Sequence, residues 1–166
     1  MLHLSILLLA FSWTDESYAA SASLDDLKGL QDPVVHLARL PKDFHRKMIQ
    51  VNRNDAYTDY EIEYCDQVGN CCNIRSGHEI GDNVSAFGKK KEIASSLFGR
   101  TKLFFPTPKE LQKNFGGDLP KRARTEMTWA HLKAVKHGPP YYAFGCEGVP
   151  ESEATSFFLS LEILKK

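Results

Sequence analysis

The 166-residue chain carries no excess of charge of either sign, because 21 lysine and arginine residues balance 21 aspartate and glutamate residues. It therefore offers no broad electrostatic attraction for nucleic acid or an anionic membrane. Beyond residues 2–13 it contains no long apolar run, so no membrane anchor is expected in the rest of the chain. Internal repeats and low-complexity stretches are also missing, which leaves an ordinary globular composition of one-domain length.

Catalytic and metal-binding motifs are equally scarce. The chain has no G-x-S-x-G, H-E-x-x-H or phosphate-loop pattern. Two of its four cysteines are adjacent and none form a C-x-x-C pair, so the spacing does not favour zinc. His131 and His137 are six residues apart and do not share one face of a helix. The sequence therefore predicts neither a metal nor a cofactor.

The chain does contain an apolar N-terminal segment of the length that is typical of a signal peptide. Residues 2–13 carry no acidic, lysine or arginine side chain, and two small-x-small cleavage sites follow, ending at Ala19 and Ala22. The run is too short to span a bilayer. We expect residues 1–22 to be a signal peptide and residues 23–166 to be a single secreted, extracellular domain. Cleavage there removes two acidic and no lysine or arginine residues, which leaves a net charge of +2.

An even number of cysteines in an oxidising compartment predicts two disulfides. Residues 57–64 and 71–75 read as two strands of a hairpin, and placing Cys65 opposite Cys71 matches their faces. A shift of one residue destroys the match. The pairs brought together are Glu61–Arg75, Ile62–Ile74, Glu63–Asn73 and Tyr64–Cys72.

This register predicts which cysteines are bonded. Cys65 and Cys71 meet on the outer, polar face of the hairpin, whereas Cys72 faces inward. Cys146 alternates with aromatic residues on its own strand and also faces inward. The predicted disulfides are Cys65–Cys71 and Cys72–Cys146.

Periodicity and turn residues predict the remaining elements. Helices are expected over residues 24–41 (broken at Pro33), 85–98, 107–116 and 125–137, and strands over 48–53, 102–106, 141–146 and 155–164. Such an order indicates an antiparallel sheet. The expected fold class is α+β, with helices packed on one face of the sheet in a single disulfide-stapled domain.

One group of side chains suggests a catalytic site. Glu61, Glu63, Arg75 and His78 fall on or beside the polar face of the hairpin. A small hydrolase such as a ribonuclease needs a general base, a general acid and a cation for a developing negative charge. The alternative interpretation is an exposed cross-strand pair beside a loop histidine, which is common on solvated faces.

Basic residues suggest two further interpretations. Lys89–Lys91 and Arg100 each follow a glycine and bracket residues 92–98, as in an amidated peptide hormone released from a precursor. The basic clusters at 89–91 and 121–124 could contact phosphates, but a nearly neutral chain favours solvated faces. Asn83-Val84-Ser85 is a sequon for N-glycosylation.

By elimination, we expect a small secreted protein that is not an enzyme and acts by binding another macromolecule, in the first instance a protein. A pathogen effector or virulence factor is one such protein. The secreted ribonuclease-like hydrolase, with Glu61, Arg75 and His78 as its site, and the hormone precursor, processed at Lys89–Lys91 and Arg100, stay as alternatives.

Overall fold

The computed structural model describes residues 23–53, 57–77, 88–115, 127–133 and 141–166. The predicted signal peptide, His78, the sequon at Asn83 and the basic cluster at 121–124 lie outside these residues. Among the described residues, no helix combines the length and apolar character needed to cross a membrane.

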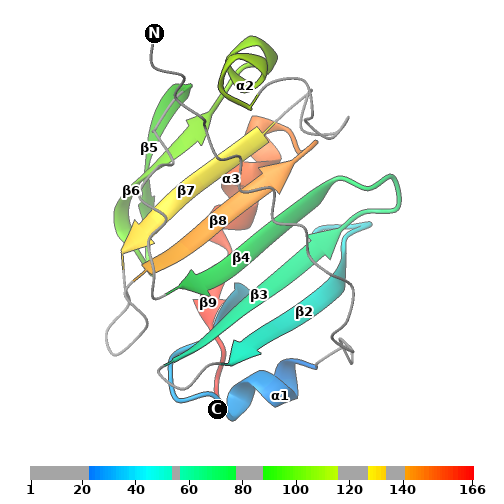
Figure 1. Cartoon of the computed structure of the whole chain (residues 1–166), viewed down its shortest axis with the longest axis vertical. Helices are drawn as coiled ribbons and strands as arrows, with labels where there is room; N and C mark the ends of the chain where they lie inside the picture. Colours follow the sequence, from blue (N-terminus) through cyan, green and yellow to red (C-terminus); the bar gives the residue numbers. More distant parts are fainter. Residues whose placement is uncertain (1–22, 54–56, 78–87, 116–126, 134–140) are drawn as a thin grey trace, which may run out of the picture.

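Most of the described chain is antiparallel β-sheet (Figure 1). Seven strands form one sheet in the order β2-β3-β4-β8-β7-β6-β5, and β1 pairs with β9 in a second sheet of two strands. The strands are β1 (Val35–Leu37), β2 (His45–Arg53), β3 (Thr58–Cys65), β4 (Cys71–Gly77), β5 (Lys89–Ser95), β6 (Gly99–Phe105), β7 (Met127–Lys133), β8 (Tyr141–Glu147) and β9 (Leu161–Ile163).

The described residues also form three short helices: α1 (Leu24–Lys28), α2 (Pro108–Phe115) and α3 (Glu151–Leu159). In Figure 1, α3 and the β1–β9 pair lie behind the large sheet. Phe157 and Phe158 of α3 are buried in the same core as Phe144 of β8, with the Phe144 and Phe158 rings 5.6 Å apart. One apolar core thus joins the large sheet to the elements behind it.

The predicted hairpin of β3 and β4 is confirmed in strand positions and register. Glu61 lies opposite Arg75, Ile62 opposite Ile74, and Cys65 opposite Cys71. Its inner side chains are buried, including Tyr60, Ile62 and Tyr64 of β3. The strands predicted at 48–53 and 141–146 are confirmed within β2 and β8, and the one at 102–106 is confirmed as far as Phe105 in β6. The helix after Thr107 is confirmed as α2.

The helix predicted over 85–98 is wrong, because the described part of that segment is strand β5 and the turn into β6. Ile93 and Ser95 are buried while Glu92 and Ala94 are exposed, which is the two-residue period of a strand. Gly99 begins β6 with a φ of +67°. Ser95 Oγ accepts hydrogen bonds from the Leu97 and Phe98 N–H groups and closes the turn.

Two further elements differ from the prediction. Residues 127–133 form strand β7 rather than a helix, because they pair with β8 along their length and with β6 at Trp129. Residues 151–159 form helix α3 where a strand was expected over 155–164, and only 161–163 are extended. The buried residues there are Ala154, Phe157, Phe158 and Leu161, whose spacing of three and four is helical.

The helix predicted over 24–41 is largely wrong. Only 24–28 is helical, and Ser23 and Asp26 form a capping box at its start. After Pro33 the chain becomes β1, whose three residues are all buried. A strand buried on both faces shows no polar alternation, so its apolar run resembles one side of a helix.

Candidate functional site

The polar face of the β3–β4 hairpin contains the described residues that were predicted to be catalytic. Asn73 Nδ2 donates a hydrogen bond to Glu61 Oε1 at 2.7 Å. Lys47 Nζ lies 3.3 Å from Glu63 Oε2. Arg75 is exposed. Each carboxylate therefore has a structural partner within the sheet, and the part of the predicted site that needs His78 stays a prediction.

Two disulfides start from adjacent residues of β4 and lie on opposite faces of the sheet. Cys65 is bonded to Cys71, with Cα atoms 4.1 Å apart, and Cys72 to Cys146, with Cα atoms 4.0 Å apart. These are the pairs that the strand faces indicated. Because the cysteines at 71 and 72 are adjacent on one strand, their side chains lie on opposite faces of the sheet. The first bridge closes the hairpin end, and the second fastens β4 to β8 on the core side.

The loop between β3 and β4 is braced by one aspartate. Asp66 Oδ1 accepts hydrogen bonds from the N–H groups of Val68 and Asn70, both at 2.9 Å, and Asp66 Oδ2 accepts one from Asn70 Nδ2 at 2.8 Å. The Asp66 N–H donates to the Asn70 carbonyl at 3.0 Å. Gly69 supplies the positive φ of +89° that the tight turn needs.

Val68 lies at the tip of this braced loop with 83% of its surface exposed, the largest value among the exposed large apolar residues of the described chain. The loop also rests on the turn after β8, where the Asn70 side chain lies against Gly148. An apolar side chain is thus presented to solvent on a backbone that is fixed at both ends. Asp66, Gly69 and Asn70 are residue types typical of a tight turn, whereas nothing in the sequence marks Val68 as the exposed tip.

A row of tyrosines links the large sheet to the small one. Val35 exchanges two hydrogen bonds with the Tyr60 hydroxyl, which accepts from the Val35 N–H and donates to its carbonyl. The Leu37 N–H donates to the Tyr64 hydroxyl at 3.2 Å. Burial raises the pKa of both phenols, so both stay protonated at neutral pH.

His36 of β1 is a buried histidine that was not among the predicted site residues. Its Nε2 lies 3.5 Å from Glu162 Oε1 on β9, and its Nδ1 is buried without a hydrogen-bond partner among the described atoms. Burial lowers the pKa of His36 from the ordinary 6.5, and the nearby Arg46 lowers it further, whereas Glu162 and a backbone contact at Leu37 raise it. The imidazole is consequently held in its neutral form.

The lysine run that opens β5 has contacts on both faces of the sheet. Lys89 and Lys91 lie 3.0 Å and 3.4 Å from the carboxylate of Glu151, the first residue of α3. Hydrogen bonding to Lys89 lowers the pKa of Glu151. Lys90, on the other face, lies over the Phe104 ring at 5.9 Å from its centroid. The predicted processing sites at Lys89–Lys91 and Arg100 therefore lie within a paired hairpin.

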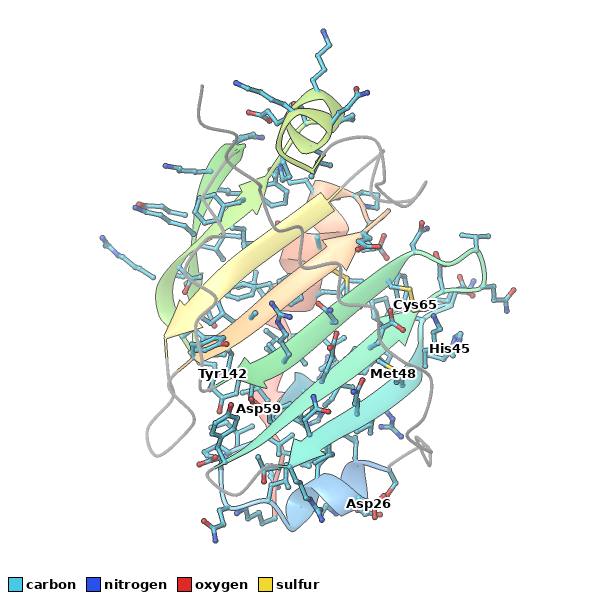
Figure 2. The ribbon with its side chains drawn as sticks, in the orientation of Figure 1. Asp26, His45, Met48, Asp59, Cys65 and Tyr142 are labelled. Atoms are coloured by element: carbon cyan, nitrogen blue, oxygen red, sulfur yellow. A yellow bond between two sulfur atoms is a disulfide. The ribbon has the colours of Figure 1, made fainter. Side chains whose placement is uncertain are left out.

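Three ligand-type side chains cluster at the base of the braced loop. An oxygen of Glu63 and the sulfurs of Cys65 and Cys71 all lie within 4.8 Å of one another. Because the two cysteines are joined in a disulfide, neither provides a thiolate in this state. His45 of β2 lies opposite Cys65 in the strand register, and Figure 2 shows the two labelled side chains at the same end of the sheet.

Comparison with known proteins adds no functional information, since no protein-family model, curated protein or solved structure matches this chain.

Proposed function

We propose that the chain is a small secreted α+β protein that is not an enzyme and acts by binding a protein partner. The observation that carries the proposal is the rigid presentation of Val68 at the tip of the loop closed by Cys65–Cys71. Two structural disulfides also suit an extracellular environment. A role as a pathogen effector or virulence factor, and glycosylation at Asn83, belong to the same proposal.

Isolated apolar residues are common on protein surfaces, so exposure alone would not support binding. Val68 differs because hydrogen bonds to Asp66 and a disulfide fix the backbone around it. A pre-ordered loop loses little conformational entropy when it binds, which leaves more of the apolar contact energy for affinity. The turn is bent rather than extended, so it suits insertion into an apolar pocket of the partner and not addition to the edge of a sheet.

The folded state of the lysine run supports this function over the hormone precursor. Residues 92–98, the peptide that processing would release, form most of β5 and its turn, and Ile93 and Ser95 are buried. Processing enzymes act on accessible, extended chain ends and loops rather than paired strands. Cleavage at Lys91 and Arg100 would remove a strand from the sheet and expose its core.

The test compares variants of the purified secreted chain, each immobilised and exposed to the same extracellular protein mixture. Val68→Asp should weaken retention of a specific protein by about tenfold or more, as expected when an apolar contact is replaced by a charge. Leu40→Asp is the matched control, because Leu40 is also exposed (42%) but belongs to another loop. The purified candidate should then show the same ranking by direct titration. Equal retention of every bound protein by wild type and Val68→Asp would contradict the proposal.

A further inference from the structure

We propose that Cys65, Cys71 and Glu63 form a redox-dependent zinc site at the base of the braced loop, with His45 as the fourth ligand. The site is separate from the proposed binding function, which requires the disulfide form. In the oxidised chain the two sulfurs are bonded to each other, and reduction converts them into two metal ligands.

The geometry of the strands favours this site. The cysteines lie directly opposite each other on β3 and β4, with Cα atoms 4.1 Å apart and side chains on one face. In tetrahedral zinc the two sulfurs stand about 3.8 Å apart, given Zn–S bonds of about 2.3 Å, and rotation of the side chains can provide that separation. Glu63 is two residues before Cys65 on the same face, so its carboxylate already lies within 4.8 Å of both sulfurs.

The fourth ligand comes from the neighbouring strand. His45 is the register partner of Cys65 on β2, so β2, β3 and β4 place a histidine and both cysteines in one row across the sheet. His45 is exposed and can reorient toward the metal at little cost. A set of two thiolates, one imidazole and one carboxylate is of the kind that zinc prefers.

Charge is balanced in both redox states. Lys47 Nζ contacts Glu63 Oε2 at 3.3 Å and neutralises this carboxylate when no cation is present. Two thiolates and the carboxylate carry three negative charges, which Zn²⁺ and Lys47 together offset. The core-side pair Cys72–Cys146 instead has apolar strand neighbours on its face within the described residues, Ile74 and Phe144.

The chemistry has two steps. A dithiol donates two electrons and two protons to the Cys65–Cys71 bond, giving two thiols, and is itself oxidised to a disulfide. Zn²⁺ then displaces one proton from each thiol and binds the two thiolates. Zinc binding therefore opposes reoxidation of the pair.

The experiment uses the full secreted chain, reduced with a phosphine because added dithiols would compete for metal, and titrated with Co²⁺ and then Zn²⁺. The proposal predicts one Co²⁺ per reduced chain with thiolate-to-cobalt absorption, displaced by Zn²⁺, and none in the oxidised chain. Glu63→Gln should weaken the affinity for the metal by about tenfold or more. Loss of a residue that only hydrogen-bonds to a metal ligand already has an effect of that size, and Glu63 is proposed to bind the metal directly. His45→Ala should weaken it similarly, whereas Glu61→Gln, on the same face two residues away, should leave it unchanged.

A second measurement guards against loss of the fold on reduction. In chains whose circular dichroism stays native, Zn²⁺ should protect the cysteines at 65 and 71 from alkylation but not those at 72 and 146. Binding that persists in the Cys65→Ser/Cys71→Ser variant would overturn the proposal. So would the absence of stoichiometric binding by a reduced chain that stays folded, or an unchanged affinity in Glu63→Gln.

Discussion

At the scale of single residues, some side chains stabilise the fold in two ways, by burying an apolar ring and by forming a hydrogen bond. Tyr60 and Tyr64 bury aromatic rings in the core while their hydroxyls bind the backbone of β1. The backbone hydrogen bonds in and beside β1 point alternately to its two sides. Val34 and Ala38 form backbone hydrogen bonds with the segment around β9. Val35 and Leu37 form theirs with the tyrosine hydroxyls. These hydroxyls thus take the place of a neighbouring strand.

Replacing Tyr60 by phenylalanine tests this role. Tyr60→Phe keeps the ring but leaves the buried N–H and carbonyl of Val35 without their partner, so we expect the free energy of unfolding to fall by about 1–3 kcal/mol. Tyr64→Phe removes one hydrogen bond rather than two and should cost less. Urea unfolding of the two variants measures both values. A Tyr60→Phe protein as stable as wild type would show that the hydroxyl does not support β1.

His36 should make stability depend on pH. Because its pKa is below 6.5 in the folded chain, the unfolded chain binds more protons between the folded pKa and 6.5. The free energy of unfolding should therefore be greatest above pH 6.5 and fall as the pH drops through that window. NMR titration should give His36 a pKa below 6.5, and His36→Gln should remove part of the fall in stability. Identical pH profiles for wild type and His36→Gln would contradict this.

At the scale of elements, the two edges of the large sheet in the described chain carry basic side chains. β5 begins with Lys89, Lys90 and Lys91, and β2 has an irregular register between Arg46 and Met48, where the exposed Lys47 lies. Charge and bulges at an edge strand hinder pairing with another chain. The lysine run that suggested processing or phosphate binding is thus explained by the position of β5.

The contact between the braced loop and the turn after β8 depends on a glycine. Gly148 has a φ of +71°, and a Cβ there would collide with the Asn70 side-chain oxygen. Gly99 has a similar φ of +67° but nothing within 4 Å, so Gly99→Ala measures backbone strain alone, about 1–2 kcal/mol. We expect Gly148→Ala to destabilise the protein more than Gly99→Ala does. When Asn70 is also replaced by alanine, the difference between the two glycine variants should become smaller. Equal unfolding midpoints for the two alanine variants would contradict this contact.

The elements that could be predicted are those whose two faces differ. In β3, apolar and charged side chains alternate, and this fixed both the strand and its register against β4. β7 and α3 were missed because their local patterns fit more than one structure, and pairing with β6 and β8 or packing on the core decided between them.

The candidate site was predictable to a similar extent. The cysteine pairs followed from strand faces, and Glu61 and Arg75 do lie opposite each other. The tyrosine hydroxyls were not predictable, because their partners are 25 and 27 residues away and belong to another sheet. The cluster of Glu63 with the outer disulfide depends on the same register. It was not predicted as a metal site because the chain has no C-x-x-C pair.

At the scale of the whole molecule, the two disulfides restrain very different lengths of chain. Cys65 and Cys71 are six residues apart, whereas Cys72 and Cys146 are 74 residues apart. In the chain-entropy account, closing these loops stabilises the folded state by about 2 and about 4.5 kcal/mol respectively. The inner bridge also links β4 to β8 at the centre of the large sheet.

Loss of the inner bridge should therefore do more harm. We expect Cys72→Ala/Cys146→Ala to lower the unfolding midpoint and the yield of folded protein more than Cys65→Ala/Cys71→Ala, since each double variant removes one bridge without leaving an unpaired thiol. Urea unfolding under non-reducing conditions and quantification of folded protein provide the comparison. The reverse order would show that the short loop, and not the inner bridge, limits folding.

The pairing itself tests the assignment of inner and outer faces most directly. Cleavage before each aspartate releases fragments 59–65, 66–81 and 118–166, which separates Cys65 from the adjacent cysteines at 71 and 72 and from Cys146. In non-reducing mass spectrometry, we predict that fragment 59–65 is joined to 66–81, and that 66–81 is joined to 118–166. Breaking the peptide bond between residues 71 and 72 in the mass spectrometer should then leave 59–65 attached to Cys71 and 118–166 attached to Cys72. Fragment 59–65 joined directly to 118–166 would mean that Cys65 faces the core, and the register and both proposed sites would be wrong.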